Sequence, residues 1–145
     1  MRKLKILFVC VHNSARNQMA EAFLKTYAGD KFEVESAGFE PGTLNPLVVD
    51  VMKEEGIDIS ENQTKSVFEL YKSGRMYNFV ITVCDQAEGE KCPIFPGIVT
   101  KLNWSFPDPS KLEGSNAEKI IGVRKIKASI KNKINQFIDI MNIES

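Results

Sequence analysis

Cys10 and Arg16 are separated by five residues of a short, mostly polar loop, and a predicted helix follows directly. The start of a helix offers unpaired backbone N–H groups and partial positive charge, which together bind oxyanions. The planar guanidinium of an arginine can hold two oxygens of such an anion. The same surroundings lower the pKa of a cysteine thiol from about 8.5 into the range of about 3.5–7.5. The pattern therefore predicts a thiolate nucleophile that faces a bound tetrahedral oxyanion.

Two flanking elements must position this loop. Residues 4–9 are apolar except for Lys5 and do not alternate with polar residues, which is typical of a strand buried on both faces. Residues 18–27 carry apolar side chains at helical spacing and end near Gly29. A cysteine and an arginine at this spacing are also common by chance, and the alternative is a structural cysteine followed by a surface turn. The strand before the loop and the helix after it favour the anion site.

The rest of the chain alternates between predicted strands and helices, which is typical of an α/β fold. We expect three layers, with a four-stranded parallel sheet and helices on both faces. Ligands of such sheets bind beyond the carboxyl ends of the strands, where Cys10 and Cys84 both lie. The predicted strands are 4–9, 32–38, 79–84 and a weaker 98–104. The predicted helices are 18–27, 46–55, 66–72 and a long final helix with apolar residues from 120 to 141.

Length and composition predict one domain over residues 1–145. Nineteen basic residues balance nineteen acidic ones, so we expect neither nucleic acid nor an anionic membrane as a partner. The apolar run near the N-terminus is too short for a signal peptide. We therefore expect a cytoplasmic protein, taken as a monomer, in which three cysteines do not form a structural disulfide framework.

Several motifs, in order along the chain, resemble one family. They are "FVCVHNSARNQMAEAF", "SAG", "NP", "GIDIS", "VITVCD", "CP" and "WSFPDPS". The chain resembles the low-molecular-weight protein tyrosine phosphatase fold, and within it most closely the arsenate reductases coupled to thioredoxin. The motifs cover most of the sequence, and their joint occurrence in this order is highly specific.

The resemblance implies a relay of three cysteines. Cys10 would attack arsenate, Cys84 would attack Cys10 and release arsenite, and Cys92 would then attack Cys84. Thioredoxin would reduce the resulting disulfide, and no cofactor would be bound. Disulfide Cα atoms lie about 4.4–6.8 Å apart, so we expect the polar segment between Cys84 and Cys92 to be flexible and to loop back during the relay. The alternative is that Cys84 and Cys92 are inert packing residues.

Asp108 lies between two prolines in "WSFPDPS". An aspartate in this setting can simply form a turn. The resemblance implies instead that Asp108 is the general acid that protonates the departing oxygen. The other function that we consider is a low-molecular-weight protein tyrosine phosphatase acting through a Cys10 phosphocysteine. Ser105 and Ser110 replace the tyrosines that usually flank this aspartate in phosphatases, so we expect phosphatase activity only as a side reaction.

The resemblance places oxyanion binding on the whole loop, with Asn13 and Ser14 bracing its backbone and His12 orienting it locally. Relatives often have serine after the arginine, where its hydroxyl stabilises the thiolate, and we expect the Asn17 amide to donate a similar bond. The expected oxyanion-binding residues are Val11, His12, Asn13, Ser14, Ala15, Arg16 and Asn17.

Two metal sites come into consideration. Three cysteines and His12 match a zinc set in composition, but no closely spaced cysteine pair is present. Some thioredoxin-coupled reductases bind potassium, and three of their ligands match Asn13, Glu21 and Ser36 of this chain. Those enzymes add a threonine and an aspartate as ligands, and at these two positions this chain has Thr64 and Ser66. Because that carboxylate is missing, an ordinary set of polar side chains remains the favoured interpretation.

Overall fold

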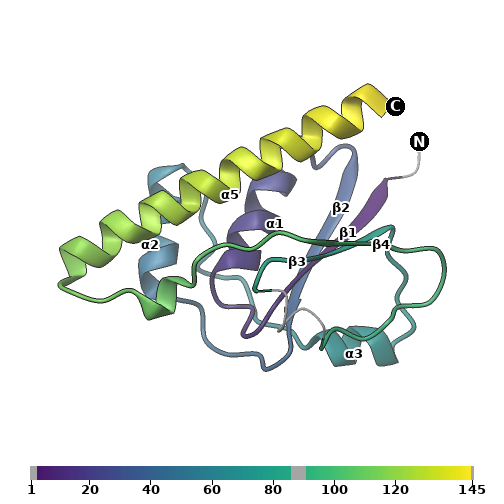
Figure 1. Ribbon diagram of the computed structural model, residues 1–145, viewed down its shortest axis with the longest axis horizontal. Coiled ribbons are helices and arrows are strands. Elements are labelled where there is room, and N and C mark those ends of the chain that lie inside the picture. Colours follow the sequence, from purple (N-terminus) through teal and green to yellow (C-terminus); the bar gives the residue numbers. More distant parts are fainter. Residues whose placement is uncertain (1–2, 86–90, 145) are drawn as a thin grey trace.

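The computed structural model describes residues 3–85 and 91–144, in which strands and helices are interspersed along the chain (Figure 1). The sheet has the order β2-β1-β3-β4, and every pair of neighbouring strands is parallel. The α/β prediction with a four-stranded parallel sheet is confirmed. The elements are β1 (Leu4–Cys10), α1 (Arg16–Ala28), β2 (Phe32–Gly38), α2 (Pro46–Glu54), α3 (Val67–Lys72), β3 (Phe79–Thr82), β4 (Thr100–Asn103), the 3-10 turn η1 (Pro109–Lys111) and α5 (Asn116–Glu144).

The two faces of the sheet are covered differently. Alternate residues of β1 point to opposite faces, so Ile6, Phe8 and Cys10 pack into one apolar cluster, and Leu7 and Val9 pack into another. Helices α1, α2 and α5 lie on the first face, where α5 crosses the molecule (Figure 1). Within the described residues, the short helix α3 and the segment around residue 95 cover the second face.

The boundaries of several elements differ from the predicted ones. Helix α1 begins at Arg16, two residues early, because its first turn holds buried polar side chains that an apolar pattern cannot reveal. Strand β3 ends at Thr82, so Cys84 lies just beyond it, although the N–H of residue 83 still donates to the Val9 carbonyl at 2.9 Å. Strand β4 covers only Thr100–Asn103, within the predicted 98–104.

Side-chain caps fix the starts of two helices. The predicted cap of α2 is confirmed, because the Asn45 side chain accepts a hydrogen bond from the N–H of Leu47 at 3.0 Å. Helix α5 starts before its first apolar residue because Ser115 and Glu118 form reciprocal hydrogen bonds, at 3.2 and 3.3 Å between backbone N–H and side chain. Among the described residues, none of the helices is both long enough and apolar enough to cross a membrane.

Candidate active site

The loop from Cys10 to Ala15 has all its carbonyl groups bonded on the outside. Backbone N–H groups of the segment after β2 donate to the carbonyls of residues 10, 11, 12 and 14, at 2.8–3.1 Å. The Gln18 side chain donates to the fifth carbonyl, that of Asn13, at 3.0 Å. In a planar trans peptide, the C=O of one residue and the N–H of the next point in opposite directions. The N–H groups of residues 11–15 are therefore directed away from these partners, as an oxyanion cradle requires.

Asn13 within the loop and Gly38 at the end of β2 fix the shape of the loop. Asn13 is fully buried and has a φ of 56°, in the left-handed region that few residues adopt. Its side chain accepts from the N–H of Lys65 at 2.9 Å and donates to the Ser36 hydroxyl at 2.9 Å. The loop also lies directly against Gly38, where a Cβ atom would come within 2.7 Å of loop backbone atoms. Bracing by Asn13 was predicted, but the glycine contact was not.

Cys10 is buried at the carboxyl end of β1, and the environment lowers the pKa of its thiol. The largest cause is a hydrogen bond from the Cys84 thiol, followed by the charge of Arg16 and the N–H of Val11. Burial and the negative charge of Asp108 oppose the shift. The same contact raises the pKa of Cys84, with burial as the second cause. Within this pair, Cys84 is therefore favoured as the proton donor and Cys10 as the site of the negative charge.

Arg16 and Asp108 meet at this sulfur although they are far apart in the sequence. One terminal nitrogen of the buried Arg16 guanidinium donates to the Phe106 carbonyl at 3.1 Å. Its other terminal nitrogen lies 3.7 Å from a carboxylate oxygen of Asp108. These two contacts hold the guanidinium in one orientation over the loop. The part played by the Phe106 carbonyl could not be read from the sequence, because any residue type supplies the same carbonyl.

Asp108 caps the short turn η1, where one of its oxygens accepts from the N–H and the hydroxyl of Ser110 at 2.9 and 2.8 Å. Partial burial raises the pKa of Asp108, but the two Ser110 hydrogen bonds and the charge of Arg16 outweigh it, so the pKa lies below its usual value. The empty site therefore holds an ionised Asp108. A bound dianion would raise this pKa again, because like charges disfavour the ionised form.

These side chains border a hollow of about 220 Å³ that is large enough for a tetrahedral oxyanion. The sequence predictions missed two of its residues, Asp85 and Lys111. Asp85 follows Cys84 directly, and Lys111 lies in the same turn as Asp108, so both could have been found by their closeness to predicted site residues. The hollow is lined by Val11, His12, Arg16, Cys84, Asp85, Asp108 and Lys111.

Cys92 lies apart from the other two cysteines. Cys10 and Cys84 belong to the apolar cluster on the helix-covered face, whereas Cys92 packs with Leu7 and Val80 on the opposite face. All three are free thiols, and burial raises the pKa of Cys92 to about 11. Most of the segment predicted to loop back, residues 86–90, lies outside the described residues.

The prediction for Asn17 is wrong. Its side-chain amide donates to the Ala37 carbonyl at 2.8 Å and to the Phe8 carbonyl at 3.5 Å, so both of its hydrogens are directed to the sheet. The amide therefore ties α1 to β1 and β2, and it leaves thiolate stabilisation to other groups. The Nδ1 of His12 lies 3.0 Å from the Glu40 carbonyl. Ser14 supports the loop through its backbone, since its carbonyl accepts a hydrogen bond from the N–H of Asn45 at 3.0 Å.

Only some of the candidate potassium ligands lie next to one another in the structure. Asn13, Ser36 and Glu21 form one chain of hydrogen bonds, in which Ser36 links the other two. The Thr64 hydroxyl instead donates to the Gly42 carbonyl at 2.7 Å. Within residues 3–85 and 91–144, no three His, Cys, Asp or Glu side chains are grouped as a metal site would need.

Comparisons with known proteins agree with this geometry. An arsenate reductase from Shouchella clausii is 40% identical over 139 residues, covering 96% of this chain and 98% of that protein. One from Bacillus subtilis is 40% identical over 136 residues, covering 92% and 94%. The structure of a thioredoxin-dependent arsenate reductase from Corynebacterium glutamicum superposes with a TM-score of 0.76 at 30% identity. That alignment covers 99% of this chain but 64% of the other, which is the longer protein.

A sequence model of one family covers almost the whole chain. The description of that family is low molecular weight phosphotyrosine protein phosphatase, and the match extends over residues 5–145. It includes the loop, Cys10, Cys84 and the aspartate that faces the guanidinium. The chain therefore belongs to the low molecular weight phosphotyrosine protein phosphatase family.

Proposed function

We propose that this protein is an arsenate reductase that takes its electrons from thioredoxin. The observation that carries the proposal is that Cys84, just beyond β3, is buried in the same cluster as Cys10 and forms a hydrogen bond with it beside the oxyanion loop. Hydrolysis of a phosphate ester needs one thiolate, whereas reduction of arsenate needs two electrons, which two thiols supply when they form a disulfide. The named relatives support the same activity.

In the first step, the Cys10 thiolate attacks the arsenic atom, and an arsenate oxygen leaves as water. Protons for this water come from arsenate itself and from Asp108, whose pKa rises when the dianion binds. The inward N–H groups and Arg16 hold the remaining oxygens. The product is a covalent adduct between the Cys10 sulfur and arsenic, which is still in its oxidised form.

In the second step, Cys84 attacks the Cys10 sulfur. The main causes that raise the pKa of Cys84 are its bond to the Cys10 thiolate, its burial and the Cys10 charge. Formation of the adduct removes the first and the third, so Cys84 then ionises more readily. The sulfur–arsenic bond breaks, its electron pair stays on arsenic, and arsenite leaves. A Cys10–Cys84 disulfide remains.

In the third step, Cys92 attacks Cys84, frees Cys10 and leaves a Cys84–Cys92 disulfide for the thioredoxin dithiol to reduce. In the described conformation Cys92 is buried on the other face with a pKa of about 11, so it is a poor nucleophile there. We therefore propose that Cys92 moves toward Cys84 before this step. The need for free thiols also places the protein in a reducing compartment, and we propose the cytoplasm.

The test is arsenate-dependent oxidation of reduced thioredoxin by the purified protein. Cys84→Ser should abolish turnover, and Cys92→Ser should allow at most one arsenite per protein molecule. Unchanged turnover in either variant would refute the relay. Hydrolysis of an aryl phosphate should be measured in the same preparation, since Cys10, Arg16 and Asp108 also suit a phosphatase. A phosphatase rate that exceeds arsenate reduction and is unaffected by Cys84→Ser would identify the protein as a phosphatase instead.

A further inference from the structure

A buried carboxylate lies beneath the oxyanion loop. Glu21 of α1 has a side chain that is only 9% exposed, and one of its oxygens accepts a hydrogen bond from the Ser36 hydroxyl. That hydroxyl in turn accepts from the Asn13 amide at 2.9 Å. Asn13 has the left-handed backbone conformation that gives the loop its turn. The position of Glu21 is thereby transmitted to the loop through two side chains.

The charge of Glu21 has a partner within the chain. The ammonium of Lys25, one turn further along α1, lies 2.6 Å from the second oxygen of Glu21. An unpaired carboxylate in so buried a position would be strongly disfavoured, because burial withdraws it from water. Lys25 therefore compensates the charge of Glu21, whose other oxygen accepts the bond from Ser36.

The potassium ligands that the family resemblance implies do not fit an ion here. Both Glu21 oxygens are bonded, and the Asn13 oxygen accepts from the N–H of Lys65. A hollow of about 180 Å³ beside Glu21 is also lined by Lys65. A metal cation bound by Glu21 in this hollow would compete with the Lys25 ammonium for the carboxylate, and the positive charge of Lys65 would repel it.

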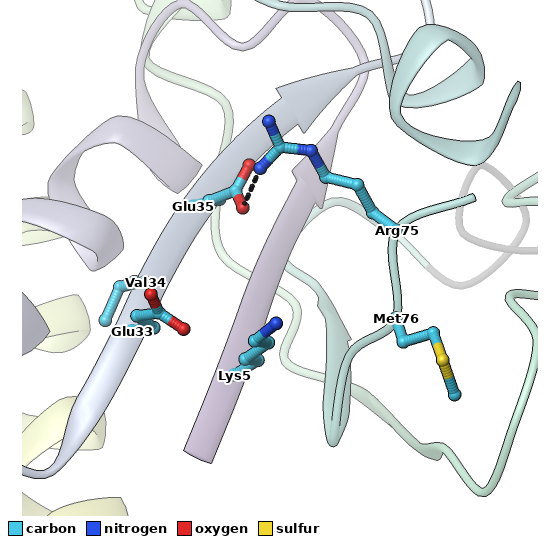
Figure 2. Close-up of a pocket in the computed structure, with 6 residues that line it drawn as sticks. All are labelled: Lys5, Glu33, Val34, Glu35, Arg75 and Met76. Atoms are coloured by element: carbon cyan, nitrogen blue, oxygen red, sulfur yellow. Dashed lines mark hydrogen bonds and ion pairs between the residues drawn. The ribbon is translucent and has the colours of Figure 1, made fainter. Parts of the chain in front are cut away.

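The ammonium of Lys65 lies on the side of Glu35. The Nζ of Lys65 lies 3.9 Å from a Glu35 oxygen, and Arg75 contacts the other oxygen at 2.7 Å. Figure 2 shows Glu35 on β2 turned toward Arg75, whereas Lys5 on β1 lies further along the sheet, opposite Glu33. Glu35 is thus paired with two cations, and Lys25 alone contacts Glu21 directly among the described cations.

We propose that Lys25 is the built-in counter-cation of the oxyanion loop, and that this protein needs no monovalent metal ion. Lys25 is a positioning residue: it holds Glu21, Glu21 holds Ser36, and Ser36 holds Asn13. The inference goes beyond the proposed reaction, because a well-shaped loop would serve arsenate and phosphate esters alike.

The wild-type protein provides the first test. The affinity for inorganic phosphate and the pH midpoint of Cys10 alkylation should be equal in potassium chloride and in choline chloride of the same ionic strength. A saturable gain in phosphate affinity with potassium would overturn the proposal. Neither readout requires arsenate turnover or thioredoxin, so failure here is distinct from failure of the proposed function.

Variants of Lys25 provide the second test. In choline chloride, Lys25→Met should weaken phosphate binding about tenfold and raise the midpoint of Cys10 alkylation by about one pH unit. Lys25→Arg, which keeps the positive charge, should stay near the wild type, and partial recovery of Lys25→Met in potassium chloride would support the proposal further. Lys131→Met is the matched control, since it removes an ammonium paired at 2.9 Å with Glu55 on α2's C-terminal side. The proposal is overturned if Lys25→Met matches the wild type or if Lys25→Arg loses as much as Lys25→Met.

Discussion

The hydrogen bond between two thiols makes a quantitative prediction about Cys10. Replacing Cys84 by alanine removes the donor that contributes most to the lowered pKa of Cys10. A hydrogen bond to a charged group contributes about 1.5–3 kcal/mol, and a thiol is a weak donor, so the lower limit applies. At about 1.4 kcal/mol per pKa unit, the pKa of Cys10 should rise by about one unit in Cys84→Ala.

The assay is the pH dependence of alkylation by iodoacetamide, with the modified Cys10 peptide quantified by mass spectrometry. Below its midpoint, Cys84→Ala should react about tenfold more slowly than the wild type, because about one tenth as much thiolate is present. Cys84→Ser should keep a low midpoint, since a hydroxyl is also a donor, while it loses all relay chemistry. This pair separates the electrostatic part played by residue 84 from its redox part.

The matched control is Cys92→Ala, which removes a thiol from the apolar cluster on the opposite face of the sheet. Its alkylation midpoint at Cys10 should equal that of the wild type. The reasoning is refuted if Cys84→Ala also keeps the wild-type midpoint, or if Cys84→Ser moves as far as Cys84→Ala. The first result would mean that Arg16 and the loop amides alone set the pKa of Cys10, and the second that the change at position 84 acts through something other than the loss of a donor.

Three further predictions concern the other residues of the site. Arg16→Lys should weaken phosphate binding roughly 10–100-fold by calorimetry, because a single ammonium cannot contact Phe106, Asp108 and the anion together; an unchanged affinity would contradict the proposed orientation. Asp108→Asn should slow the first step by roughly 10²–10⁴-fold without weakening anion binding. The pKa of Asp108, which is lowered in the empty site, should rise when phosphate binds, as an NMR titration would show, and a pKa that stays fixed would count against a role as acid. Asn13→Ala should lower the free energy of unfolding by about 2–4 kcal/mol in urea titrations, since it loses two buried hydrogen bonds and strains a left-handed position; a loss under about 0.5 kcal/mol would show that the brace is weak.

Much of this site can be predicted from local sequence. An apolar run followed by Cys10, a polar loop and Arg16 identifies a strand, a cradle and a helix, because the elements and the loop are contiguous. The parallel order of the sheet follows from the alternation of strands and helices. Parallel strands end at the same edge, so even the closeness of Cys10 and Cys84 is predictable.

The direction in which a buried polar side chain points could not be predicted from the sequence. The sequence pattern suggested that the Asn17 amide would face the thiolate, but in the structure it donates to the Ala37 carbonyl. Helix α1 packs closely on β1 and β2, and a buried amide there must bond the nearest free carbonyl, since leaving its hydrogens unpaired costs free energy. No local pattern specifies which carbonyl that will be.

The sequence by itself therefore determined which residues are chemically able to act and which strand ends they occupy. Only the tertiary structure decided which of them touch: Phe106 and Asp108 reach Arg16, and Cys92 lies on the face away from Cys10. The physical reason is the range of the forces involved. The pattern of apolar and polar residues that determines burial can be recognised in a continuous stretch of sequence. A hydrogen bond or an ion pair acts over only a few ångströms, so it depends on how segments that are distant in the sequence pack together.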